Sequence, residues 1–290
     1  MPTAVLDGVE IAYEDVGAGT PIVFCHEFAG SMESWDLQMS YFARRYRTIR
    51  YNARGYAPSG VPLSPNEYSQ DHQVETLYQL LVHLGIEKAY LCGLSMGAHC
   101  VLNFGLAHPD SCLAIIAAGA GTGSANPEVM RTESEERASK LLAGGMAGQE
   151  PYLSGTTRIR FQEKDPVGWQ EFSSLFMAHS PTGSSNTLRG FQARRPTLYS
   201  REAEFARFPV PTLIIVGDED DPCIEPSIFL KRTIPRSGVL MLPQTGHACN
   251  LEEPARFNAG ISEFLSLVEA GRWGPRPTGS GDAWNLAPNR

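Results

Sequence analysis

The 290-residue sequence has no apolar run close to the roughly 20 residues that a membrane-spanning helix needs. Its first residues show no basic stretch followed by an apolar one, so no secretory signal is predicted. Basic residues are not in excess, since 24 Lys and Arg stand against 32 Asp and Glu, a formal net charge of −8. We therefore expect a cytoplasmic protein whose main partner is neither nucleic acid nor an anionic membrane.

The six cysteines lack the spacing of a metal site or of a disulfide framework. There is no Cys-x-x-Cys pair and no regular Cys/His spacing. Cys25, Cys92 and Cys112 lie in apolar, strand-like runs, where a reduced thiol behaves as a small hydrophobic side chain. The sequence thus predicts neither a bound metal nor a disulfide, which fits a reducing compartment.

Short apolar runs, typical of buried strands, alternate with amphipathic segments over the first 120 residues. Two strands at 3–6 and 9–15 are joined by Asp7-Gly8, a strong hairpin signal. Further strands are predicted at 21–25, 46–51, 89–93 and 112–119, with helices at 33–44, at 70–84 and directly after Ser95. This alternation predicts an α/β fold, with a mostly parallel sheet and helices on both of its faces.

The alternation stops near residue 120 and resumes near residue 206. The segment between these points has no strand of the buried type and holds helix-like stretches around 127–147, 166–179 and 184–194. After it, strands are predicted at 211–216 and 239–242, and helices at 225–234 and 254–269. We therefore predict a sheet domain in two parts, 1–120 and 206–270, a helical cap or lid insertion at 121–205 and a flexible tail at 271–290.

The stretch Gly93-Leu-Ser95-Met-Gly97 lies between a predicted buried strand and a helix. So sharp a turn brings the residues two before and two after the serine almost into contact, which favours glycine at both positions. The turn holds Ser95 in a strained conformation with its hydroxyl projecting from the end of the strand. The backbone N–H of Met96 then faces any negative charge that forms beside Ser95.

A serine hydroxyl is a weak nucleophile at neutral pH and needs a base. His247 follows the last predicted strand, and a group of acidic residues at 218–221 follows the strand before it. Because the carboxyl ends of parallel strands lie along one edge of a sheet, these groups can meet Ser95 there. Histidine would take the proton, and one of Asp218, Asp220 and Asp221 would orient the imidazole.

Five motifs together resemble the α/β-hydrolase fold, in its lid-bearing esterase, lactonase and epoxide-hydrolase branch. They are His26-x-x-x-Gly30-Ser31, Arg54-Gly55, Gly93-Leu-Ser95-Met-Gly97, Gly217-x-x-Asp220 and Gly246-His247, within about residues 9–270. The resemblance implies that Ser95 is the nucleophile, His247 the general base and Asp220 the orienting acid. It also implies an oxyanion hole formed by the backbone N–H groups of Phe28 and Met96.

A serine at the elbow, rather than an aspartate, argues against dehalogenase and epoxide hydrolase chemistry. We expect a carboxylic-ester hydrolase acting on an ester or thioester of a small to medium, partly apolar acid, without metal or organic cofactor. Enol-lactonase and carbon–carbon bond hydrolase activities use the same residues and are alternatives, because the lid selects the substrate. A small-molecule receptor that keeps the triad is an alternative of another class. The expected partner is a small ester or lactone, and the expected assembly a monomer or homodimer.

Several residues outside the triad are candidates for lining the pocket. In the insertion these are Trp169, Phe176 and His179, although most aromatic side chains there are expected to pack within the insertion. Arg189, Arg194 and Arg195 would either contact an anionic part of the substrate or lie on a solvated face, and we favour the second interpretation.

The loop that begins at His26 departs from the family pattern. Related chains usually have glycine after this histidine, whereas this chain has Glu27. We expect His26 to organise the loop, and Glu27 to point away and pair with a neighbouring arginine or a backbone donor. The alternative is that Glu27 lines the pocket and contacts a polar or cationic part of the substrate.

Overall fold

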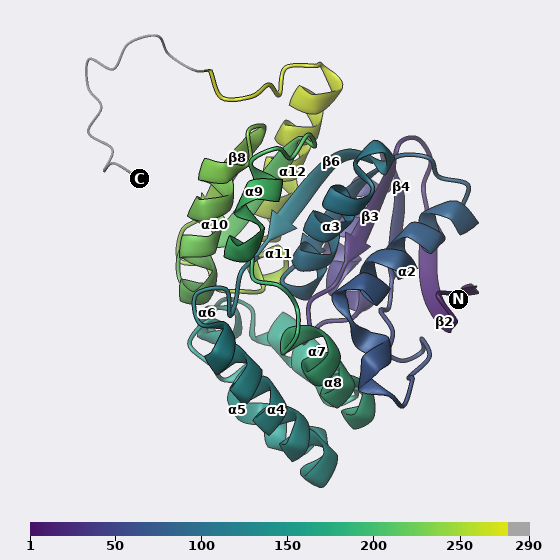
Figure 1. Ribbon diagram of the computed structural model, residues 1–290, viewed down its shortest axis with the longest axis vertical. Helices are drawn as coiled ribbons and strands as arrows, with labels where there is room; N and C mark the ends of the chain where they lie inside the picture. Colours follow the sequence, from purple (N-terminus) through teal and green to yellow (C-terminus); the bar gives the residue numbers. More distant parts are fainter. Residues whose placement is uncertain (278–290) are drawn as a thin grey trace.

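The computed structural model describes residues 1–277 and contains one eight-stranded sheet (Figure 1). The strands are β1 (Thr3–Leu6), β2 (Val9–Val16), β3 (Pro21–Cys25), β4 (Arg47–Tyr51), β5 (Ala89–Leu94), β6 (Cys112–Ala118), β7 (Thr212–Gly217) and β8 (Ser237–Leu242). Their order in the sheet is β1-β2-β4-β3-β5-β6-β7-β8. Strand β2 runs antiparallel to both neighbours, and every pair from β4 to β8 is parallel. The predicted mostly parallel sheet is confirmed.

Helices cover both faces of this sheet (Figure 1). One face packs against α2 (Gln70–His83), α3 (Met96–Ala107) and α10 (Asp221–Thr233). The other face packs against α1 (Asp36–Phe42) and α12 (Pro254–Glu269), with α11 (Cys249–Glu252) beside them. Successive residues of the central strands therefore enter opposite cores, as Leu91 and Cys92 do, which explains why these strands are apolar throughout.

The hairpin between β1 and β2 has the predicted tight turn. Asp7 and Gly8 both have positive φ, +46° and +75°, as a type I′ turn requires, and Leu6 pairs directly with Val9. At the carboxyl ends of the central strands, Cys25 of β3 pairs with Gly93 of β5, and Gly93 pairs with Ala117 of β6. The loops that follow β3 and β5 consequently begin at the same edge of the sheet.

The residues between β6 and β7 form helices rather than strands. The longer ones are α4 (Pro127–Gly144), α7 (Pro166–Met177) and α8 (Pro181–Thr187), and the shorter ones are α5 (Glu150–Leu153), α6 (Ile159–Lys164) and α9 (Glu202–Phe205). Single turns occur at Met146–Gln149, Leu188–Gln192 and Tyr199–Arg201. We call residues 119–211 the helical insertion; its helices α4, α7 and α8 lie below the sheet in Figure 1. The apolar core of the insertion includes Phe28 and Ala248 from loops of the sheet domain. The insertion therefore packs directly onto the edge of the sheet from which these loops begin.

Some element boundaries differ from those predicted. The helix expected from residue 225 begins at Asp221, because Pro222 in the first turn needs no hydrogen-bonded N–H there. The segment expected as one helix at 33–44 contains a 3₁₀ turn at Met32–Trp35 before α1. In the predicted tail, the Trp273 indole donates to the Arg236 carbonyl at 2.9 Å and contacts Phe264 edge to face, while residues 278–290 lie outside the described residues.

None of the helices within residues 1–277 combines the length and the apolar character of a membrane span.

Candidate active site

Ser95 is the single residue between β5 and α3, and its backbone is strained, with φ +53° and ψ −107°. A Cβ at Gly93 would lie 2.2 Å from the Gly97 oxygen, and a Cβ at Gly97 would lie 2.0 Å from the Cys25 oxygen. Only glycine fits either position. A non-glycine residue in such a conformation costs about 1–3 kcal/mol and persists because the surrounding structure imposes it. The strand, tight turn and helix predicted around Ser95 are present.

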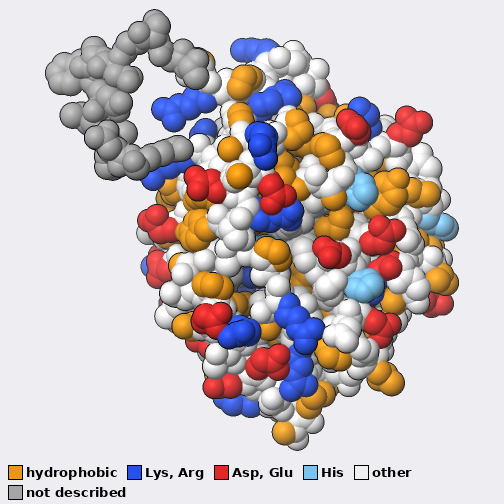
Figure 2. Space-filling model, viewed as in Figure 1, with side chains coloured by type: hydrophobic (Ala, Val, Ile, Leu, Met, Phe, Trp, Pro, Cys, Tyr) orange, Lys and Arg blue, Asp and Glu red, His pale blue; other side chains and the backbone are white. Residues whose placement is uncertain are grey.

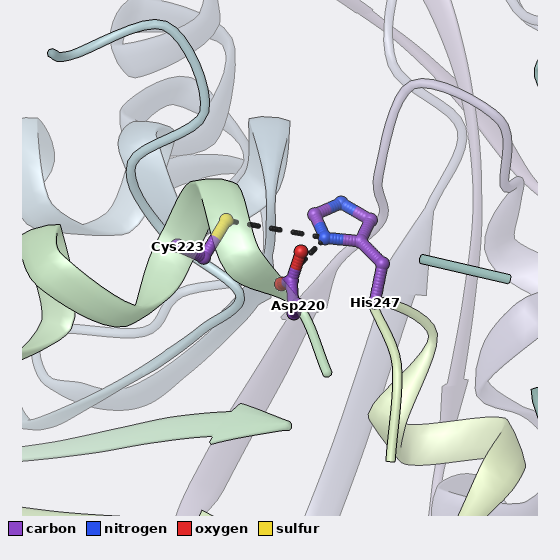
Figure 3. Close-up of side chains that lie close together, drawn as sticks. All are labelled: Asp220, Cys223 and His247. Atoms are coloured by element: carbon purple, nitrogen blue, oxygen red, sulfur yellow. Dashed lines mark hydrogen bonds and ion pairs between the residues drawn. The ribbon is translucent and has the colours of Figure 1, made fainter. Parts of the chain in front are cut away.

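His247 meets a carboxylate on the side of its ring that bears Nδ1. Its Nδ1 lies 2.8 Å from Oδ2 of Asp220, a buried residue that precedes α10 (Figure 3). Asp218 instead accepts a hydrogen bond from the Thr245 backbone N–H at 3.1 Å and so joins the loops after β7 and β8. Asp221 is exposed at the start of α10. Of the three aspartates, the structure brings Asp220 to the imidazole.

Asp220 and His247 each favour the charged form of the other. Burial alone would lower the pKa of His247, but the charge and hydrogen bond of Asp220, together with the charge of Glu27, raise it above its usual value. Burial would likewise raise the pKa of Asp220, yet the neighbouring imidazole holds it below its ordinary value. Asp220 is therefore ionised at neutral pH, and His247 is a stronger base than a free imidazole.

Cys223 is the third polar side chain beside this pair (Figure 3). Ligand atoms of Asp220, Cys223 and His247 lie within 4.8 Å of one another, which is close enough to consider a metal ion. A zinc site would need a thiolate and a free imidazole nitrogen. Here burial raises the pKa of the Cys223 thiol well above its usual value, the thiol donates to the Gly119 carbonyl, and Nδ1 is bonded to Asp220. The chemistry of these residues does not fit a metal site.

The backbone N–H groups of Phe28 and Met96 donate no hydrogen bond within residues 1–277. Met96 begins α3, where the helix dipole favours negative charge. The loop that carries Phe28 is held by His26, whose Nδ1 donates to the Glu27 carbonyl at 2.7 Å while its Nε2 accepts from the Ala53 N–H at 3.0 Å. Both ring nitrogens of His26 are thus used to organise the loop, as expected.

A cavity of about 480 Å³ joins these groups. Ser95, His247 and Phe28 contribute to its wall from the sheet domain. The helical insertion contributes most of the remaining wall, including Met130, Tyr152, Leu188 and Arg195. A volume of this size suits a small organic molecule.

The sequence profile of the alpha/beta hydrolase fold family matches residues 20–254. The chain belongs to the α/β-hydrolase fold family. Strands β3 to β8, the elbow and the two loops that carry Asp220 and His247 all lie within the matched residues.

Relatives of this α/β-hydrolase differ in the reactions that their names describe. A putative 2-succinyl-6-hydroxy-2,4-cyclohexadiene-1-carboxylate synthase from Bacillus subtilis is 27% identical over 274 residues, 91% of this chain and 97% of the relative. A putative carbamate hydrolase from Pseudomonas savastanoi is 26% identical over 255 residues, 84% of this chain and 93% of the relative. Among solved structures, the enol-lactonase from Burkholderia xenovorans has a TM-score of 0.82 at 23% identity, covering 91% of this chain and all of that one.

In this α/β-hydrolase, Glu27 forms a buried ion pair with Arg158 of the insertion. The two Arg158 nitrogens lie 2.5 and 3.1 Å from the carboxylate oxygens, and each side chain is 1% exposed. The same carboxylate lies 3.8 Å from Nε2 of His247. The arginine partner was expected, but it is distant in sequence, and the carboxylate faces the general-base candidate instead of pointing away. Arg158 and His247 hold the pKa of Glu27 below its usual value despite burial.

The structure places the other pocket candidates outside the cavity wall. Trp169 and Phe176 belong to the apolar core of the insertion, where Trp169 meets Phe161 edge to face at 5.6 Å. His179 is buried against Tyr56, and burial lowers its pKa to about 3. His26 acts on the loop, as described above.

Of the three arginines singled out in the sequence, Arg195 lines the cavity. Arg189 pairs with Glu135 on the surface, and Arg194 is exposed and contacts Asn66. The lining also includes Arg137 and Lys140, which the sequence interpretation did not single out. The spacing of Arg137 and Lys140 could have indicated that both side chains point the same way, because residues three apart on a helix share a face.

Proposed function

We propose that this α/β-hydrolase is a serine hydrolase that cleaves a carboxylic ester of a small to medium, partly apolar substrate. Family membership supports hydrolase chemistry. The proposal depends above all on one arrangement: Ser95 on its strained turn and the Asp220-bonded His247 line the same cavity. A nucleophile, a base and an orienting carboxylate are the parts that acyl transfer through a serine requires.

The proposed reaction begins when Ser95 Oγ attacks the ester carbonyl and His247 Nε2 takes the hydroxyl proton. Asp220 stabilises the imidazolium through Nδ1, and the N–H groups of Phe28 and Met96 bind the oxyanion. Collapse of the tetrahedral intermediate expels the alcohol, which receives the proton from His247. Water activated by His247 then attacks the acyl-enzyme and releases the acid and free Ser95. A lactone is an internal ester and would open by the same steps.

We propose that the helical insertion is the cap of this site. Three features support this role: it supplies most of the cavity wall, its core includes Phe28, and its Thr157 carbonyl accepts the backbone N–H of His247 at 2.7 Å. Residues of the insertion would then set the length and the charge of the accepted substrate.

The test is Ser95→Ala together with a fluorophosphonate probe. We expect turnover of p-nitrophenyl esters to fall by about 10⁴–10⁶ without loss of the fold, since this is the usual cost of losing such a nucleophile. The probe should label Ser95 in the unmodified enzyme. Labelling of a different serine, or an alanine variant with most of its activity, would overturn the assignment. A folded protein that binds esters and turns them over extremely slowly would indicate the receptor alternative.

A further inference from the structure

The cavity wall carries more basic than acidic side chains. Its basic side chains are Arg137, Lys140, Arg158 and Arg195, and its acidic ones are Glu133 and Asp220. Arg158 is neutralised by Glu27, and Asp220 is bonded to His247.

Within residues 1–277, no acidic side chain forms an ion pair with Arg137, Lys140 or Arg195. Glu133 is the only acid of the wall that is likewise outside any ion pair in the described part of the chain. With Arg158 paired to Glu27, the three basic side chains Arg137, Lys140 and Arg195 outnumber the two acids Glu133 and Asp220, so the wall keeps one surplus positive charge while His247 is neutral.

This surplus belongs to the cavity and not to the protein as a whole. The chain has a net charge of −8, and the face in Figure 2 shows acidic and basic side chains interspersed over the insertion. Elsewhere in the insertion, Arg131 pairs with Glu128, Arg160 with Glu219 and Arg189 with Glu135, whereas the exposed Arg194 contacts only the neutral side chain of Asn66 among the described residues.

Arg137 is held in position by contacts that do not neutralise it. Its guanidinium lies 4.0 Å from the centre of the Tyr152 ring and 5.5 Å from that of Phe28. Its hydrogen bond goes to the amide oxygen of Gln149 at 3.3 Å. Because Phe28 also supplies an oxyanion donor in the proposed reaction, a group bound by Arg137 would lie within reach of the reacting carbonyl.

Arg195 lines the same cavity from the segment that follows Leu188–Gln192. It donates to the Thr122 carbonyl at 2.7 Å and to the side chain of Gln192. Both acceptors are neutral, and burial lowers its pKa to about 10, so the half-buried guanidinium is charged at neutral pH. A partly desolvated cation without a counter-charge is unfavourable, and an anion brought by the ligand would relieve that cost.

We propose that the substrate carries a carboxylate, which Arg137, Lys140 and Arg195 bind while the ester carbonyl lies at Ser95. The planar guanidinium groups match a carboxylate in shape and charge. Lys140 is exposed, at the edge of the cavity, where it would attract the anion from solution. The position of the ester in this substrate rests on the proposed function, whereas the anion site does not.

The test compares two p-nitrophenyl esters of matched length: the pentanoate and the glutarate half-ester, which ends in a carboxylate. We expect kcat/KM at low salt to be about tenfold higher for the half-ester, the smaller effect of a hydrogen bond to a charged group. Arg137→Gln and Arg195→Gln should abolish this preference mainly by raising KM, and added salt should weaken it. Arg195→Lys, which keeps the charge, should retain part of it.

Arg189→Gln and Arg194→Gln are matched controls, because both arginines lie outside the cavity wall. Equal turnover of both esters by the unmodified enzyme, or equal losses on both esters in the cavity variants, would overturn the carboxylate site. If neither ester reacts, the proposed function fails, and calorimetric titration of glutarate into the unmodified protein decides the anion site. Saturable binding weakened by Arg137→Gln supports it, whereas no binding, or tighter binding of inorganic phosphate, overturns it.

Discussion

At the scale of single residues, the buried Glu27–Arg158 pair lies directly beside the imidazole of His247. Its carboxylate lies 3.8 Å from His247 Nε2, the atom that takes the proton of Ser95 in the proposed reaction. Alone, this charge would stabilise a protonated His247 and oppose a nearby oxyanion. Arg158, only 1% exposed, offsets it. The pair thus allows a carboxylate to be buried beside the imidazole of His247.

Glu27→Gln should destabilise the protein, because it leaves the buried Arg158 without its counter-charge. We expect a loss of about 3–5 kcal/mol in the free energy of unfolding, typical of breaking a buried pair from one side. Urea denaturation measures it. Glu253→Gln, which removes a partner of the more exposed Lys164, is the matched control and should cost less than about 1 kcal/mol. Equal effects of the two substitutions would contradict a structural role for the buried pair.

The pH dependence of kcat/KM should show the raised pKa of His247. The base must be neutral to accept a proton, so activity should rise with pH through a midpoint above 6.5, the ordinary value. Asp220 and Glu27 raise this pKa and Arg158 lowers it. Glu27→Gln removes one raising charge and leaves Arg158 uncompensated, so both effects shift the midpoint to lower pH. A midpoint that stays in place, measured with a neutral ester, would show that Glu27 does not act on the base.

Asp220→Asn should reduce turnover by about 10⁴, since an amide cannot fix the imidazole tautomer as a carboxylate does. Asp218→Asn is the matched control: its side chain accepts a backbone hydrogen bond from Thr245, which an amide oxygen can also accept. Steady-state kinetics with one ester ranks the two variants. The reverse ranking would mean that the carboxylate bonded to His247 in the structure is not the one used in catalysis.

The sequence predicted Ser95 and His247 because each belongs to a short local motif. Asp220 could be chosen among its neighbours through the Gly-x-x-Asp spacing, and its side chain lies at the imidazole. Arg158 could not be found in this way. Its partner is 131 residues away, and no local pattern marks an arginine whose role depends on how the insertion packs.

At the scale of elements, the sheet domain was more predictable than the insertion. Strands buried on both faces are apolar throughout and end at recognisable turns, so their positions follow from sequence alone. The insertion contains the four-residue helices Glu150–Leu153 and Glu202–Phe205, which were not predicted. Helices this short are not stable by themselves and form only because tertiary packing supports them.

Met130→Ala should enlarge the cavity from the side of α4 and shift the preference toward longer acyl chains. Met130 lines the cavity, whereas Val129, its neighbour on the helix, is exposed and serves as the control position for Val129→Ala. A series of p-nitrophenyl esters measures the shift, and fluorophosphonate labelling of Ser95 should be unchanged in both variants. Loss of labelling in Met130→Ala would indicate that this part of the insertion supports the reactive geometry itself.

At the scale of the whole molecule, the sequence predicted which elements exist but not their neighbours. Nothing local specifies that β4 lies between β2 and β3, because this order depends on how the helices pack across the sheet. The cavity is a further product of assembly, since its wall combines loops of the sheet domain with side chains from α4 and from the segment after Leu188–Gln192. Its surplus of positive charge appears only when those parts are placed together.

In the proposed reaction, the contact between Thr157 and His247 links the position of the insertion to the state of the base. The Thr157 carbonyl accepts the His247 amide at 2.7 Å, and the next residue of the insertion neutralises Glu27. Outward movement of this segment would therefore remove the backbone support of the base and uncover a negative charge beside it in one step. A substrate held under an open insertion would meet an imidazole that is poorly placed and too readily protonated. Closure of the insertion over the substrate would thus place and deprotonate the base in the same step. Water that enters while the insertion is open would meet an imidazole that cannot activate it.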